Sequence, residues 1–202
     1  MTKRNYIETN EAEDVAGSIR HVLRCAKLVS SDPQAWKWGL LTLHSALQGA
    51  CVCHLTGTAA PLGAVTRANA EKWTKYFEDS RDNPDAKPPK TELMTLPDLL
   101  KAVRKPGSAG SHISNGGGRI EISDKEINWL KRLHDEIRNQ FIHFQPMSWS
   151  IDVSGVPEFA RTVARIIKDI LAYGWAFRHL DNEKKSELAS DLELLSKESW
   201  SV

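Results

Sequence analysis

The sequence is poor in the features that mark several classes of protein. Its 202 residues include only three cysteines, Cys25, Cys51 and Cys53, which are too few and too odd in number for a disulfide framework. No apolar run approaches the roughly 20 residues that a membrane-spanning helix needs, and the first residues lack the apolar segment of a secretory signal. We therefore expect a cytoplasmic protein with reduced cysteines and no contact with a membrane.

An excess of charge of either sign is also lacking. Lys and Arg together number 27 and Asp and Glu number 26, which leaves a net charge of +1. Such a chain has no long-range field that attracts a polyanion, so any contact with nucleic acid must be local. With 41% hydrophobic and 26% charged residues, the composition is that of a soluble globular protein. The length fits one domain over residues 1–202.

Apolar residues recur at helical spacing in the first part of the chain. Residues 11–30 repeat them at steps of three and four, which predicts an amphipathic helix. Asp32 and Pro33 predict the N-cap and first position of a second helix, which should run to about Leu55. A third stripe, containing Trp73 and Phe77, predicts a helix that ends near residue 80. We expect these N-terminal helices to occupy about 11–80.

Breaker residues dominate the middle of the sequence. We assign about 81–122 to a linker that contains one short helix, "LPDLLKAVRK". The stretch near 106–118 is so rich in glycine and serine that it cannot bury enough apolar surface to offset its ordering entropy, which predicts a loop.

The last part, about 123–199, again predicts helices. Ser123 and Glu126 have the spacing of a capping box, which predicts a helix start. Pro146 disfavours continuation of that helix, and Pro157 can begin a long helix through "PEFARTVARIIKDILAYGWAFRHL". A more polar helix should follow. Because no segments alternate convincingly enough to form a sheet, we predict an all-α fold, an antiparallel helical bundle.

A polar set of residues lies near the end of the helix that Ser123 starts, in "DEIRNQFIHFQP", residues 135–146. With Arg138 at zero, Asn139 lies at about 100° and His143 at about 140° on an ideal helix. They lie opposite the predicted buried stripe, which consists of Leu130, Leu133, Ile137, Phe141 and Phe144. Arginine can grip a phosphate, an amide can orient groups, and imidazole can move a proton near neutral pH. On one helix Arg138 and His143 would splay apart, so convergence needs a loosened helix end or a second copy of the chain.

At these residues, "RNQFIH" resembles the motif of HEPN domains. In that family an arginine, a polar residue directly after it and a histidine a few positions later mark one helix end of an all-α bundle. Arg138, Asn139 and His143 match that motif position by position. The resemblance implies an HEPN-like bundle and a homodimer whose motif helices face each other across a cleft.

The resemblance also implies an activity and an alternative to it. Catalytic members cut RNA without a metal or cofactor, through attack of the 2′-hydroxyl on its own phosphodiester. His143 would then be a general acid or base, Arg138 a charge stabiliser and Asn139 an orienting group. The alternative is a non-catalytic module that binds a nucleotide or an unknown protein partner. A surface ion pair from Asp135 to Arg138, with His143 favoured by the helix dipole, would explain these residues without any chemistry.

Other reactive residue types give weaker patterns. His44, Cys51, Cys53 and His54 include metal-ligand types, but Cys53 should point away from Cys51 and His54 on a helix, and no second ligand pair follows. We therefore expect no metal site and buried cysteines. A basic strip, consisting of Lys101, Arg104, Lys105 and Arg119, fits a solvated face better than an RNA-guiding edge.

Overall fold

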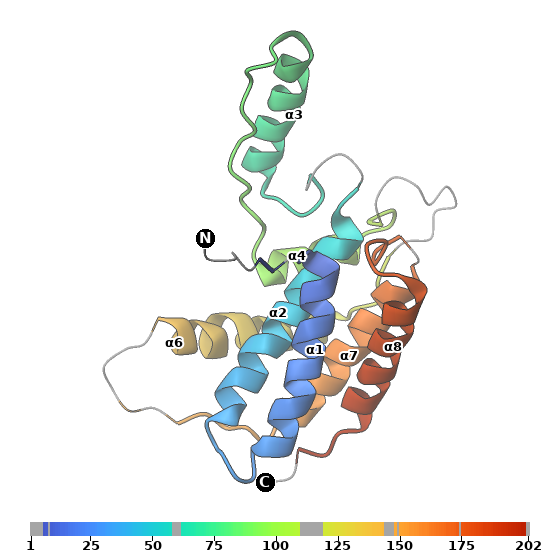
Figure 1. The fold of residues 1–202 in the computed structure, drawn as a ribbon. Helices are drawn as coiled ribbons and strands as arrows, with labels where there is room; N and C mark the ends of the chain where they lie inside the picture. The colour runs from blue at the N-terminus through green and yellow to red at the C-terminus, as the bar shows by residue number, and fades with distance from the viewer. Residues whose placement is uncertain are drawn as a thin grey trace, which may run out of the picture.

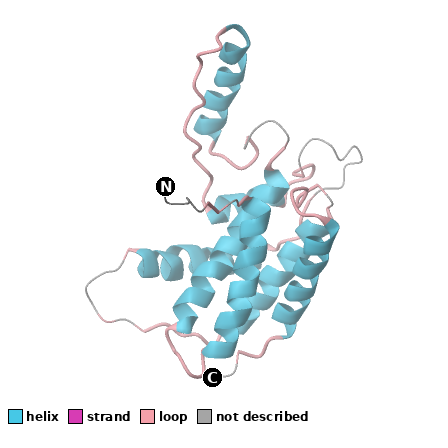
Figure 2. Cartoon of the chain, in the orientation of Figure 1, coloured by secondary structure: helices cyan, strands magenta, loops and turns pink. Residues whose placement is uncertain are grey.

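A computed structural model describes most of the chain, namely residues 6–7, 9–57, 62–109, 119–143, 148, 150–173 and 175–200. Helices provide almost all of its regular structure (Figures 1 and 2). Over these ranges there is no β-strand, only one isolated antiparallel bridge between Val65 and Leu93. The predicted all-α class is therefore confirmed.

Four helices pack side by side as the main body: α1 (Glu11–Leu28), α2 (Ala35–Leu55), α7 (Val156–Ala172) and α8 (Asn182–Lys197). Short connections make α1 antiparallel to α2 and α7 antiparallel to α8, and α1 and α2 also contact α8 and α7 respectively (Figure 1). The α1 helix starts at Asn10, whose side chain accepts hydrogen bonds from the first backbone N–H groups, as an N-cap does.

The apolar stripes of these helices meet in one core. Each stripe consists of aliphatic side chains at steps of three and four residues, which is the pattern that buries one face of a helix. Fully buried members include Val15, Ile19, Leu43, Leu47, Val163, Ile167, Leu188 and Leu192. Burial of apolar surface at this core stabilises the body.

A second set of helices crosses the body. Helix α4 (Leu96–Val103) packs on α2, and α5 (Asp124–Arg132) continues through a π-helix, η1 (Leu133–Arg138), into α6 (Asn139–Ile142). In Figure 1 this second run lies across the bundle and its last turn, α6, extends beyond it. The residues of the sequence motif are therefore at the free end of a crossing helix.

Helix α3 (Arg67–Asp82) projects from the body together with the returning segment 83–91, and we call this part, residues 67–91, the arm (Figure 1). Only Asn69 is buried in this helix. Trp73, Tyr76 and Phe77 contact one another at ring-centroid distances of 5.5–5.8 Å, so the predicted aromatic stripe exists. It packs within the arm, however, and is not part of the core.

Several predicted boundaries differ from the structure. Helix α2 begins at Ala35, because Asp32 accepts from the Gln34 N–H in a turn that precedes the helix. Helix α7 ends at Ala172 rather than near residue 180, because Tyr173 leaves the helical region with a ψ of 96°. Of the predicted loop near 106–118, only residues up to 109 are described, and they are not helical.

Candidate active site on the crossing helix

The start of the crossing helix is fixed by the predicted capping box. Ser123 Oγ accepts from the Glu126 N–H at 3.2 Å, and Glu126 Oε2 accepts from the Ser123 N–H at 2.8 Å. Burial alone would raise the pKa of Glu126, but the hydrogen bonds from Ser123 and Arg165 outweigh burial and lower it below the ordinary value. Glu126 therefore stays ionised at neutral pH.

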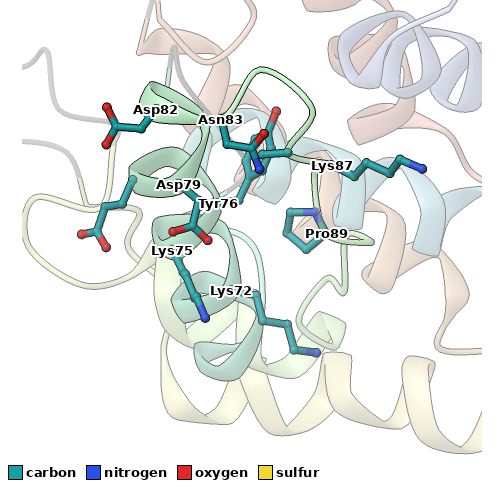
Figure 3. Close-up of a pocket in the computed structure, with 10 residues that line it drawn as sticks. Lys72, Lys75, Tyr76, Asp79, Asp82, Asn83, Lys87 and Pro89 are labelled. Carbon is teal, nitrogen blue, oxygen red and sulfur yellow. The ribbon is translucent and has the colours of Figure 1, made fainter.

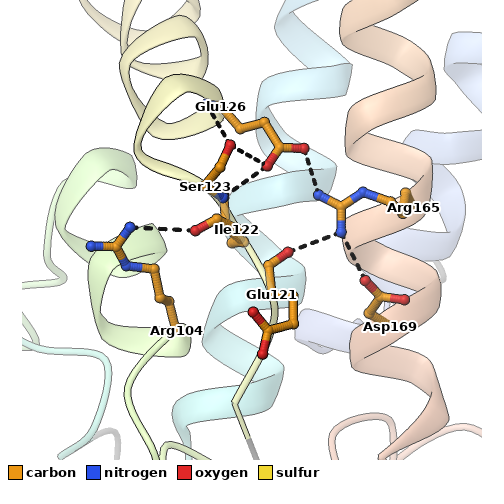
Figure 4. A network of polar contacts seen from close by, with 7 residues as sticks. All are labelled: Arg104, Glu121, Ile122, Ser123, Glu126, Arg165 and Asp169. Atoms are coloured by element: carbon orange, nitrogen blue, oxygen red, sulfur yellow. Dashed lines mark hydrogen bonds and ion pairs between the residues drawn. The ribbon is translucent and has the colours of Figure 1, made fainter.

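Arg165 of α7 extends this cap into a network (Figure 4). Its guanidinium donates to Glu126 at 2.8 Å, to the Glu121 carbonyl at 2.9 Å and to Asp169 at 2.9 Å. Arg104, the C-cap residue of α4, donates to the Ile122 carbonyl from the other side. Two helices thus hold the segment that leads into α5, and the crossing helix is fixed at its first turn.

The middle of the crossing helix departs from α-helical geometry. Residues Leu133–Arg138 form a π-helix, in which hydrogen bonds run from residue i to i+5 and the turn is widened by one residue. Our prediction of a continuous α-helix through Arg138 was therefore wrong. Single π-turns inside helices are frequent at functional sites, and this one ends at the arginine of the motif.

Arg138 and Asn139 form the first part of the motif. Arg138 Nη1 donates to Asn139 Oδ1 at 2.8 Å, and both side chains are half-buried. Asp135 pairs with Lys131 at 3.8 Å and Glu136 with Arg132 at 3.2 Å. Within the part of the chain that the structure describes, neither carboxylate forms an ion pair with Arg138.

This pairing leaves the two side chains with more donors than acceptors. The guanidinium has further N–H groups, and the Asn139 amide keeps its Nδ2 donor while one lone pair of Oδ1 accepts from Arg138. Adjacent groups that are rich in donors suit an oxyanion such as a phosphate.

His143 lies one turn further on. Its N–H donates to the Asn139 carbonyl at 2.9 Å and its own φ and ψ of −102° and 54° end the helix. The side chain is exposed, as predicted for a residue at the last turn. No hydrogen bond joins His143 to Arg138 among the residues described, which agrees with the splay expected from an ideal helix. Among the described residues, the motif therefore does not close on itself within one chain.

The structure brings together two histidines, one from α2 and one from the π-helix before the motif, that the sequence did not indicate. His44 of α2 and His134 of η1 share a hydrogen bond, with 2.8 Å between Nε2 and Nδ1, and their rings stack with centroids 5.1 Å apart. His44 is only 5% exposed. The pair links α2 to the π-helix, so it fixes the wide turn that precedes Arg138.

The charges around this pair favour its neutral form. Burial, the neighbouring His134 and the Arg138 guanidinium lower the pKa of His44 to about 4. Burial also lowers the pKa of His134, and Arg138 adds to this, while Asp135 and Asp98 of α4 act in the opposite direction. Arg138 therefore lies beside neutral imidazoles at pH 7, and its charge stays available to a ligand.

The metal-ligand residue types in α2 do not converge. Cys51 and Cys53 are fully buried, and burial raises the pKa of Cys51 to about 12, which keeps the thiol protonated and unreactive. His54 contacts Ser108 Oγ at 2.8 Å. Across the described ranges no group of three or more His, Cys, Asp or Glu side chains is placed to hold a metal ion.

The projecting arm has a concave surface of its own (Figure 3). Its lining includes Lys72, Lys75 and Lys87 but also Glu78, Asp79 and Asp82, so the charges oppose one another. Much of the predicted basic strip is similarly neutralised, because Lys101 pairs with Asp98, Arg104 with Asp124 and Arg119 with Glu121. Neither surface competes with the motif as an anion site.

Comparisons with known proteins add no further assignment. No protein-family model, no curated protein and no solved structure matches this chain. Within the described part of the chain, no helix combines the length and apolarity needed to cross a bilayer.

Proposed function

We propose that the protein is an HEPN-like endoribonuclease that acts without a metal ion, with Arg138, Asn139 and His143 as its catalytic residues. The observation that supports this proposal is the joint presentation of the motif at the end of the crossing helix. Arg138 and Asn139 are hydrogen-bonded to each other, neither side chain makes a further hydrogen bond within the described part of the chain, and His143 is exposed one turn away.

The proposed reaction uses the RNA 2′-hydroxyl as the nucleophile. A general base removes the 2′ proton, the 2′ oxygen attacks the adjacent phosphorus, and the bond to the 5′ oxygen breaks after or with its protonation. The products are a 2′,3′-cyclic phosphate and a 5′-hydroxyl. His143 serves as the base or the acid. Arg138 and Asn139 donate to the phosphoryl oxygens, whose charge builds in the transition state.

A second copy of the chain completes the proposed site. Helical geometry separates Arg138 and His143 of one chain by about 140°, so one phosphodiester would not reach both. A two-fold axis beside the protruding α6 would bring the His143 of one copy towards the Arg138 of the other, because a two-fold interface repeats the same surface on both subunits. We therefore propose a homodimer with two equivalent composite sites.

Cleavage of a labelled single-stranded RNA in excess chelator tests the activity. We expect cyclic-phosphate ends with the parent protein, and a loss of at least about a hundredfold in His143→Ala and Arg138→Ala, in line with loss of a general acid or base or of a charge stabiliser. Matched controls are His179→Ala and Arg132→Ala, both exposed and outside the motif. Cleavage that persists in both motif variants would contradict the proposal.

Mixing the two inactive variants tests the composite site. If each site takes Arg138 from one copy and His143 from the other, half of the randomly mixed dimers contain one intact site of two, and about a quarter of the parental activity returns. No recovery after verified subunit exchange would contradict sites shared between copies in this way.

The alternative, a non-catalytic module that binds nucleotides, is favoured by the absence of excess positive charge on the chain. That function predicts nucleotide binding that weakens in Arg138→Ala, together with no cleavage of any RNA by the parent protein. The two functions are therefore separated by the parent's product analysis alone.

A further inference from the structure

A pocket of about 480 Å³ opens where the start of α2 faces the end of the crossing helix. Its walls come from α2, from α6 and from the segment that leads to α7. The described residues that line it are Pro33, Gln34, Trp36, Lys37, Leu40, Phe141, Ile151 and Val153. Phe141 places the pocket next to the motif, because this residue lies in the same helical turn as Asn139 and midway between Asn139 and His143 in sequence.

The pocket combines aromatic walls with one cation. Trp36 is held in place by stacking on Trp200, with ring centroids 5.1 Å apart. Lys37 Nζ lies 4.8 Å from the Trp38 ring centroid and 6.0 Å from that of Phe141. Lys37 is the only charged side chain among the described lining residues, so the pocket favours a ligand with a flat apolar ring and a negative charge nearby.

One exposed aromatic ring lies next to the cation of the pocket. The Trp38 ring centroid is 4.8 Å from Lys37 Nζ, and Trp38 is 52% exposed. The volume lies in the range of small-ligand sites, roughly 300–1,000 Å³.

We propose that this pocket binds a nucleobase of single-stranded RNA, stacked against Phe141, with Lys37 contacting the phosphate attached to it. The base belongs to a nucleotide next to the phosphodiester held by Arg138 and Asn139, a placement that rests on the proposed function. Stacking on an aromatic ring is tolerant of base identity, while Gln34 at the rim offers both a donor and an acceptor to the base edge. The pocket therefore positions the strand and contributes to substrate affinity.

Binding is tested with an RNA that cannot be cleaved. A short oligonucleotide in which every 2′-hydroxyl carries a methyl group lacks the nucleophile, so its dissociation constant with the full chain reports binding alone. We compare it with a set of oligonucleotides in which one nucleotide at a time is abasic. In the parent protein, removal of the base that enters the pocket should raise the dissociation constant about tenfold, as expected for loss of one stacked base.

Two variants probe the pocket, each with a matched control. Phe141→Ala should raise the dissociation constant of the complete oligonucleotide about tenfold and should abolish the difference between it and the abasic one. Lys37→Gln, at a half-exposed position that is expected to tolerate the change, should raise it several-fold and reduce its salt dependence. The controls, Tyr76→Ala and Lys75→Gln on α3, should leave it unchanged. Circular dichroism confirms that each variant is folded.

Each outcome decides the proposal. Coupling between Phe141→Ala and one abasic position supports it, also when the parent protein cuts no RNA, in which case only the catalytic proposal fails. The proposal is overturned if the parent does not bind the oligonucleotide, or if Phe141→Ala and Lys37→Gln both bind it as the parent does. The proposal would also be overturned if an apolar peptide occupied the pocket and the RNA oligonucleotide did not displace it.

Discussion

His44 and His143 carry the same side chain in opposite surroundings. His143 is exposed at a helix end. His44 is buried against His134, with Arg138 and Asp98 among the charged groups that act on the pair. The same residue type thus serves the proposed chemistry at one position and the geometry of the motif at the other.

The buried position makes stability depend on pH. The pKa of His44 is lowered from 6.5 to about 4, so between these values the unfolded chain binds more protons than the folded chain, and stability decreases as pH falls through that window. We expect a loss of about 2–3 kcal/mol in the free energy of unfolding between pH 7 and 4 from this residue. Urea denaturation at several pH values measures it.

His44→Gln should remove most of that pH dependence, because the amide can donate to His134 but does not titrate in this range. His179→Gln, at an exposed position beside Glu11, should leave it nearly unchanged. An identical pH profile for His44→Gln and the parent would contradict a neutral, buried His44.

Trp200 gives a second prediction at this scale. Its ring is 1% exposed, stacks on Trp36 and meets Gly39 so closely that a Cβ there would lie 3.3 Å from the ring. Trp200→Ala should cost about 3–5 kcal/mol in the free energy of unfolding, as for large aromatic truncations in a core. Trp38→Ala, which removes an exposed ring, should cost less than about 0.5 kcal/mol. Similar losses for both variants would contradict the assigned burial.

The crossing helix is made of parts that differ in how far the sequence predicts them. Its start follows from local chemistry, since Ser123 and Glu126 are three residues apart and need no distant partner. Its π-turn depends on a contact between His44 and His134, which are 90 positions apart, and no periodicity reports such a contact. The stripe of Leu130, Leu133 and Ile137 was predicted, because helical spacing alone places those residues on one face.

The residues of the candidate site also differ in how far the sequence predicts their positions. The sequence placed His143 at the helix end correctly, because a proline three positions later is expected to disfavour continuation of a helix. Phe141 was predicted only as part of the apolar stripe, and its place in a pocket with Lys37 and Ile151 depends on segments that meet only in the folded chain. Helix α7 was predicted too long, since "AYGWAFRHL" continues the apolar spacing past Tyr173, where the helix ends.

Substitution of Arg165 tests how strongly its side chain stabilises the first turn of the crossing helix. Arg165→Met keeps much of the side-chain length but removes the donors to Glu126, Asp169 and the Glu121 carbonyl. We expect a loss of about 1–2 kcal/mol in thermal or urea denaturation, because Glu126 loses its charged partner. Arg161→Met, which removes only an exposed pair with Glu158, should cost less than about 0.5 kcal/mol. Equal costs would show that the network adds nothing beyond a surface pair.

At the scale of the whole molecule, the described chain consists of a body, the crossing helix packed on it, and a projecting arm. The core lies between α1, α2, α7 and α8, and the crossing helix is packed onto that core through Leu130 and Leu133. The arm, residues 67–91, contributes none of its side chains to the core. The proposed site therefore depends on the crossing helix, on the body that holds it and on a second copy of the chain, and not on the arm.

The ends of the arm meet at its base, which makes its removal a direct test of this division. The Thr66 N–H donates to the Glu92 carbonyl at 3.0 Å, and Met94 N–H donates to the Ala64 carbonyl at 3.0 Å, so a short Gly-Ser linker can replace 67–91. Asn69, the buried residue of α3, donates to the Lys90 carbonyl and accepts from the Glu92 N–H. Its hydrogen bonds therefore lie within the arm and at its base. We expect the free energy of unfolding to change by less than about 1 kcal/mol, since almost no buried apolar surface is lost.

A matched substitution shows whether the measurement can detect a real loss. Leu99→Ala in α4, which follows the arm directly, truncates a fully buried side chain and should cost about 2–5 kcal/mol. RNA binding and any cleavage should survive deletion of the arm, because the motif lies on the crossing helix and the pocket beside Phe141 lies between that helix and α2. A deletion as damaging as Leu99→Ala would show that the arm supports the fold, whereas loss of RNA binding from a stable deletion variant would place part of the RNA contact on the arm.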